Sequence, residues 1–142
     1  MYGVLLFDSP LKSILKPVFK LKTKIIYLKK LQKETFISYG KTESGKTGDI
    51  IATLPIGYAD GLDRRFSNGG TVKISGRECK IIGRVCMDMT MIVIPESIKD
   101  RVEIGTEVDI YDEEIQTAAE KIGTIADELM TRINKRVQRR YV

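Results

Sequence analysis

The chain has 142 residues, 42% of them hydrophobic and 30% charged, with a formal net charge of +5. This length and composition predict one soluble globular domain with its own core, and no apolar run approaches the roughly 20 residues that cross a membrane. The sequence contains no histidine, which excludes histidine-based metal sites and Ser/His or Cys/His hydrolase arrangements, so proton transfer must use tyrosine, lysine, cysteine or a carboxylate.

The first quarter of the chain is predicted to form strands. An apolar run over residues 1–7 comes first and reads like the end of a longer segment. Between Phe19 and Tyr27 apolar residues alternate with lysines, a period of two that predicts one half-buried antiparallel strand. After a polar turn at residues 29–33, residues 34–39 predict a second strand.

Polar and glycine-containing segments separate the next predicted strands. Residues 41–48 are predicted as a surface loop before a strand at 49–56. A second loop at 62–70 contains the run Ser-Asn-Gly-Gly, whose residues tolerate positive φ. Residues 71–83 alternate around a turn that contains Gly76, which predicts a β-hairpin.

Two further strands, at 89–94 and 106–111, bring the predicted number to about eight. Short antiparallel strands joined by turns are typical of an all-β barrel or sandwich. The only convincing helix covers residues 116–131, where Thr117 and Glu120 have the form of a capping box. The fold class is therefore mainly β, with one or two short helices near the C-terminus.

The end of the chain leaves two points open. Gly123 interrupts the predicted helix, and Thr124 with Asp127 could cap a second short helix. The basic segment 134–142 is consistent with either a closing strand or a tail. No internal repeat or second domain boundary is present, so residues 1–142 are predicted to form a single domain.

Basic residues are concentrated in the first quarter of the chain and in its last eleven residues. Such runs can bind phosphates, and a small basic β-barrel that binds nucleic acid is therefore one alternative. The ten aromatic residues are not interleaved with the basic ones as stacking platforms would be. Solvated strand faces are the favoured explanation of both runs.

The two cysteines, Cys79 and Cys86, lie seven positions apart, and Cys86 belongs to a strongly apolar run. Buried thiols in a reducing compartment are favoured over a disulfide. The start of the chain does not have the form of a signal peptide. A cytoplasmic location is therefore expected, without contact between this domain and a membrane.

Three motifs at predicted strand ends carry the candidate chemistry. Loops at strand ends can present a functional group that the strand holds in place, although each motif alone is equally consistent with a buried strand and its turn. The motifs are Ser38-Tyr39-Gly40, Pro55-Ile56-Gly57-Tyr58-Ala59-Asp60-Gly61 and Gly83-Arg84-Val85-Cys86-Met87-Asp88-Met89.

Together and in this order, the motifs resemble the C-terminal β-domain of bacterial alanine racemases, over about Tyr2 to Tyr141. In that family an N-terminal (β/α)8 barrel carries pyridoxal phosphate on a lysine, and the C-terminal domain of the partner subunit completes the site. The resemblance implies that this chain is the β-domain alone, without the barrel and inert by itself. It implies a homodimeric full-length enzyme that supplies D-alanine for peptidoglycan precursors.

The resemblance also assigns a catalytic role to Tyr39. Racemisation removes the Cα proton from one face of the substrate and returns it on the other, which two bases on opposite faces can do. By resemblance these bases are the cofactor lysine and Tyr39. Tyrosine phenols ordinarily titrate near pH 10, so donors or positive charge, expected on the barrel, must stabilise the anion. The alternative is a rim tyrosine that simply packs.

Other site residues are implied in the same way. Met87 resembles the residue whose backbone N–H meets the substrate carboxylate. Tyr58 and Asp88 resemble residues that shape the entrance for small amino acids. For Tyr58 the alternative is a buried aromatic whose hydroxyl bonds to backbone, and Cys86 is equally consistent with plain core. No metal site is expected.

Asp127 departs from the pattern of the family, which typically has a tyrosine there. Racemases that accept serine, including the soluble domains of membrane-bound serine racemases, resemble this chain in having a smaller polar residue at that position. Asp127 could leave room for a hydroxymethyl group and accept its hydrogen bond, or it could be only a carboxylate in the first turn of a helix capped by Thr124. Alanine is the principal substrate hypothesis, and a serine or broad-specificity racemase with a membrane-bound parent is the alternative.

Overall fold

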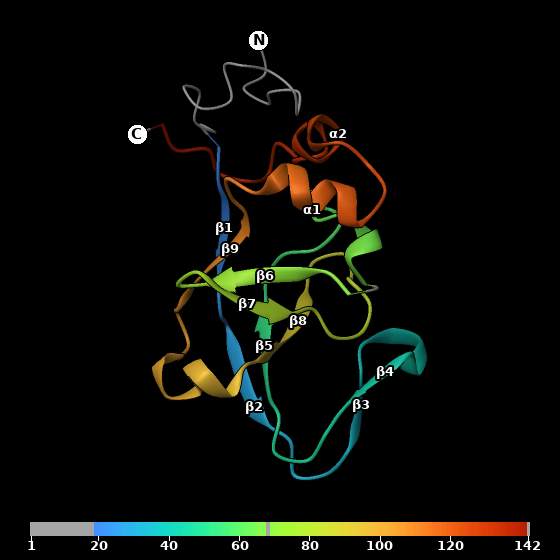
Figure 1. Cartoon of the computed structure of the whole chain (residues 1–142), viewed down its shortest axis with the longest axis vertical. Coiled ribbons are helices and arrows are strands. Elements are labelled where there is room, and N and C mark those ends of the chain that lie inside the picture. The colour runs from blue at the N-terminus through green and yellow to red at the C-terminus, as the bar shows by residue number, and fades with distance from the viewer. Residues whose placement is uncertain (1–18, 68, 142) are drawn as a thin grey trace.

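Figure 1 shows the computed structural model, which describes residues 19–67 and 69–141. The predicted apolar start at residues 1–7 lies outside the described residues. Within them the chain forms nine short strands, and every strand pairing is antiparallel. The strands are β1 (Leu21–Lys24), β2 (Tyr27–Lys30), β3 (Thr35–Ile37), β4 (Glu43–Gly45), β5 (Ile50–Leu54), β6 (Thr71–Ile74), β7 (Arg77–Lys80), β8 (Thr90–Ile94) and β9 (Glu107–Tyr111).

The strands make three sheets. One has the order β1-β9-β6-β7, the second has the order β2-β5-β8, and β3 with β4 forms a separate two-stranded hairpin. An isolated bridge between Ile81 and Ile92 connects the two larger sheets. The predicted mainly β, antiparallel class is confirmed, but in the part of the chain that is described the sheets do not join into a closed barrel.

The alternating run from Phe19 to Tyr27 was predicted as one strand, and this is wrong because the chain changes sheets within it. The Ile25 N–H donates to the Thr106 carbonyl and the Ile26 N–H to the Thr53 carbonyl, both at 3.0 Å. β1 therefore pairs with β9 and β2 with β5, and Figure 1 shows them as successive parts of one path. After the change of sheet, Tyr27 is 54% exposed instead of facing the core.

Two segments predicted as polar connections contribute to the structure. The loop predicted at residues 41–48 contains β4, which closes a hairpin on β3. Leu31, in the predicted turn at 29–33, is buried and packs with Ile51 and Ile82 in a small second core. The hairpin predicted around Gly76 is confirmed.

Two short helices follow β9, α1 (Ile115–Lys121) and α2 (Ala126–Thr131). Gly123 between them has a φ of +73°, which confirms the predicted interruption. Both predicted capping boxes are wrong, because α1 starts before Thr117 and α2 is preceded by Ile125, and neither helix has a side-chain cap. Residues 134–141 form no strand, so the described part of the end is a tail. Figure 1 places both helices at one end of the molecule and the β3–β4 hairpin at the other.

The main core lies between the two larger sheets and the helices. Its fully buried side chains include Leu54 and Ile92 from the second sheet, Val108 from the first, and Leu129 from α2. Both cysteines are free and buried, as predicted. None of the helices in the described ranges is long and apolar enough to cross a bilayer.

Candidate active site

An open depression of about 870 Å³ brings the three sequence motifs together. Tyr39 reaches it from the β3–β4 hairpin, Tyr58 from the turn after β5, and Met87 and Asp88 from the loop before β8. Four of the five predicted site residues therefore share one surface. The lining consists of Tyr39, Tyr58, Asp63, Arg64, Arg84, Val85, Cys86, Met87, Asp88 and Arg132.

The turn after β5 and the loop before β8 are joined through their backbones. The Tyr58 N–H donates to the Cys86 carbonyl and the Ala59 N–H to the Met87 carbonyl, both at 3.0 Å. A Cβ atom on Gly57 would lie 2.2 Å from the Cys86 oxygen, nearer than real Cβ atoms come. Only glycine therefore permits this approach.

Met87 lies in the loop before β8, at the rim of the depression. The residue is 53% exposed. Its carbonyl accepts the bond from Ala59, whereas its N–H donates to no described residue. A backbone donor that bonds none of the described residues and lies at the rim of a depression is suited to an anionic ligand.

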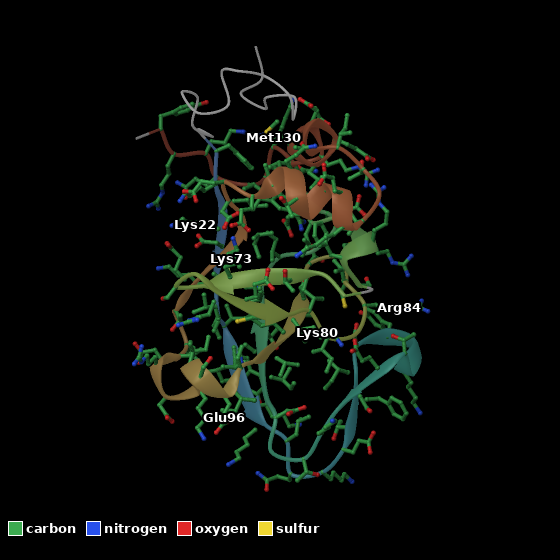
Figure 2. All side chains as sticks on the ribbon, in the orientation of Figure 1. Lys22, Lys73, Lys80, Arg84, Glu96 and Met130 are labelled. Atoms are coloured by element: carbon green, nitrogen blue, oxygen red, sulfur yellow. The ribbon has the colours of Figure 1, made fainter. Side chains whose placement is uncertain are left out.

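Tyr39 lies on a turn that leaves its side chain 69% exposed, without a hydrogen bond to any described residue. The hairpin that carries it is anchored by Glu43, which accepts a bond from the Gly83 N–H at 3.0 Å and pairs with Lys80. Figure 2 shows Arg84 directed outward on the side of the molecule where this hairpin meets the rest of the domain.

Asp88 forms an ion pair with Arg136 that was not predicted from the sequence. Arg136 bonds Asp60 through Nε at 2.7 Å and Asp88 through Nη2. Asp60 in turn accepts the Gly57 N–H at 2.8 Å. Arg136 was interpreted only as part of a basic run, and its spacing from the motifs gave no signal of this contact.

A buried carboxylate in the lining of the depression was not predicted from the sequence. Asp63 is only 4% exposed, and Arg65 binds it with two bonds, Nε–Oδ1 at 3.0 Å and Nη2–Oδ2 at 2.8 Å. Arg132 bonds the same Oδ2 atom. The hydrogen bonds from Arg65 hold the pKa of Asp63 below its ordinary value, against the opposing effect of burial. The run Asp-Arg-Arg after the second motif was the available signal.

The remaining predicted residues are placed as follows. Tyr58 lies exposed at the rim, which argues against the buried alternative. Asp127 is half-buried in the first turn of α2 and is not among the residues that line the depression. Its role in specificity stays a prediction.

The residues that line the depression can contact pyridoxal phosphate from one side only. The described residues that line it include arginines and tyrosines, which can donate hydrogen bonds, but no lysine. This chain therefore offers charge and hydrogen bonds to such a group rather than the amine that would hold it covalently.

Comparison with known proteins is consistent with this geometry. Residues 18–141 match the family described as "Alanine racemase, C-terminal domain". The chain is 42% identical to an alanine racemase of Fusobacterium nucleatum subsp. nucleatum over 125 residues, 88% of this chain and 35% of that protein. It is 45% identical to alanine racemase 2 of Caldanaerobacter subterraneus subsp. tengcongensis over 90% of this chain and 34% of that protein. It thus spans about a third of the length of these relatives.

The chain is also similar in fold to solved structures of alanine racemases. The alanine racemase of Clostridium difficile 630 in complex with cycloserine superposes with a TM-score of 0.85 at 35% identity, covering 96% of this chain and 37% of that one. The alanine racemase of Bacillus anthracis with bound L-Ala-P gives a TM-score of 0.81 at 37% identity, covering 96% of this chain and 36% of that one.

Proposed function

Because this chain belongs to the family of alanine racemase C-terminal domains, we propose that it serves a pyridoxal-phosphate-dependent enzyme that interconverts L- and D-alanine. The observation that carries the proposal is the meeting of Tyr39, Tyr58 and Met87 around one open depression. An exposed phenol and a backbone N–H that bonds none of the residues seen in the structure are the groups that proton transfer and carboxylate binding require.

In this proposal each residue has one task. The Tyr39 phenol removes or returns the substrate α-proton on one face, and the Met87 N–H donates to the substrate carboxylate. Tyr58 and Asp88 shape the entrance. The chemistry supplied by bound pyridoxal phosphate, on a lysine elsewhere in the full-length protein, is electron withdrawal from the substrate Cα, which acidifies its proton.

The depression is open, so a second wall is needed to exclude water from the reaction. We assign that wall to the partner subunit of a homodimer in the cytoplasm, and we expect the isolated domain to be inert. Asp127 lies outside the depression, and alanine is therefore favoured over serine.

The basic runs give little support to nucleic-acid binding. Lys20, just before β1, pairs with Glu113, and Lys22 on β1 pairs with Glu107. In the last residues Arg136 pairs with two aspartates. These ion pairs agree with solvated faces and internal bridges rather than with a phosphate-binding surface.

Changing Tyr39 to Phe in the full-length, cofactor-loaded protein tests the proposal. We expect racemisation to fall by about 10²- to 10⁴-fold, because general base catalysis contributes that much. Exchange of the α-proton with D2O, followed by NMR, should be lost from one enantiomer only, while the cofactor absorbance is unchanged. The matched control is Tyr27→Phe, an exposed tyrosine outside the depression. Exchange retained from both enantiomers in Tyr39→Phe would refute the assignment.

A further inference from the structure

Ser38, the residue before Tyr39, has a backbone conformation that belongs to glycine. Its φ is 67° and its ψ is −170°, a region that residues with a Cβ atom essentially do not adopt. Glycine would enter it without steric cost. A serine in such a place is strained, and its side chain must provide something that glycine cannot.

The side chain provides a bond to another motif of the site. The Ser38 hydroxyl donates to the Arg84 carbonyl at 2.7 Å, 46 positions later in the sequence. Its oxygen also lies 3.3 Å from the Cys86 sulfur. The Cys86 thiol itself donates to the same Arg84 carbonyl, with the sulfur 3.5 Å from the oxygen. Both partners belong to the loop that presents Met87.

The two segments also approach as closely as their backbones permit. A Cβ atom on Gly83 would lie 2.5 Å from the Ile37 oxygen and 2.8 Å from the Ser38 Cβ. Tyr39 itself has no hydrogen bond to the described residues, so the turn alone determines where its phenol lies. Two polar side chains link this hairpin to the loop of Met87, Glu43 through the Gly83 N–H and Ser38 through the Arg84 carbonyl, and Ser38 is the one next to Tyr39.

We propose that Ser38 is a positioning residue for the racemase reaction, an inference that rests on the function proposed for Tyr39. Its hydroxyl bond to the Arg84 carbonyl sets the distance between the Tyr39 phenol and the Met87 N–H, which address the same substrate. A misplacement of about 1 Å at a reacting group lowers rates by about 100-fold. The hydroxyl at this strained position fixes the turn, whereas glycine would leave the turn free to move.

The test compares Ser38→Gly and Ser38→Ala in the full-length, cofactor-loaded protein. We expect both variants to lower kcat by about 10- to 100-fold, with KM for alanine within about threefold because the Met87 N–H stays in place. The loss should fall on α-proton exchange from the enantiomer that Tyr39→Phe affects. Ser38→Gly should unfold at the same temperature as the wild type or higher, since glycine relieves the strain. Its crystal structure should show the Tyr39 turn displaced from residues 83–87.

Two controls separate the hydroxyl link from other effects. Ser44→Ala removes an exposed hydroxyl from the same hairpin and should leave kcat unchanged. Thr35→Ala removes a second hydroxyl from this hairpin, one that bonds the Lys33 carbonyl outside the depression, and should also leave kcat unchanged. A loss of kcat equal to that of Ser38→Gly in either control would overturn the assignment to the Ser38 bond.

Wild-type kcat in Ser38→Gly would overturn the inference. If Tyr39→Phe is inactive at the same time, the proposed function stands and only the positioning role fails. If Tyr39→Phe is fully active, the proposed function itself fails.

Discussion

Replacing Gly57 with alanine adds one methyl group, which should separate the turn that carries Tyr58 from the loop that carries Met87. Alanine would place its Cβ 2.2 Å from the Cys86 oxygen and 2.4 Å from the Met87 oxygen. Both are backbone atoms, so no flexible side chain can move aside. The backbones must part, which breaks the bonds that Tyr58 and Ala59 donate. Each bond contributes about 1 kcal/mol and overpacking costs about 1–3 kcal/mol, so we expect Gly57→Ala to lower the free energy of unfolding by about 3–5 kcal/mol.

Scanning calorimetry and steady-state kinetics on the full-length enzyme measure this effect. For a domain of this size the expected loss corresponds to a transition lower by about 6–20 °C, and KM for alanine should rise because the Met87 N–H is displaced. Gly48→Ala is the control, because a Cβ atom there meets nothing within 4 Å and only its φ of +93° is unfavourable, a cost of about 1 kcal/mol. A Gly57→Ala transition equal to that of Gly48→Ala, with unchanged KM, would contradict the reasoning.

Two further substitutions probe the buried groups beside the depression. Asp63→Asn should lower the free energy of unfolding by about 2–4 kcal/mol at pH 7, measured by thermal unfolding against the exposed control Asp100→Asn. Arg65 lowers the pKa of Asp63 in the folded state, so this stabilisation is fully present above the ordinary value of 3.8 and is lost as the pH falls through the lower folded value. The stabilities of the variant and the wild type should therefore start to converge as the pH falls below 3.8, and a difference that stays constant would count against the ion pair. Tyr111→Phe removes the hydroxyl that donates to the Gly61 carbonyl at 3.2 Å. It should lower the free energy of unfolding by about 1–2 kcal/mol, and an unchanged unfolding temperature would contradict this expectation.

Local pattern predicted the strands and turns, and it did not predict where the chain changes partners. Gly76 and Gly123 marked a hairpin turn and a helix break because glycine reports a local need for positive φ. The alternation stops at Ile25, where Ile26 and Tyr27 follow as further apolar residues. This break does not show by itself that the backbone bonds of Ile25 and Ile26 go to two different sheets. Leu31 was assigned to a turn because its neighbours are polar, although its side chain fills a small core between distant strands.

The site likewise has residues that the sequence predicted and contacts that it did not predict. Motif resemblance located Tyr39, Tyr58 and Met87, and the structure gathers them at one depression. Several contacts that hold the site together join residues far apart in the sequence, such as Ser38 with Arg84, 46 positions apart, and Arg136 with Asp60, 76 positions apart. Such contacts depend on the complete fold, and a single sequence carries no local sign of them.

The pairing of β1 with β9 bears on how the domain is made. Lys22 on β1 and Glu107 on β9 bond across 85 sequence positions. At synthesis rates of about 5–20 residues per second, the first strand waits roughly 4–17 s for its neighbour to emerge from the ribosome. The β6–β7 hairpin needs only a tight turn and can form meanwhile. Assembly of the first sheet is therefore a late event in translation, and until then the backbone of β1 is open to mispairing with other chains.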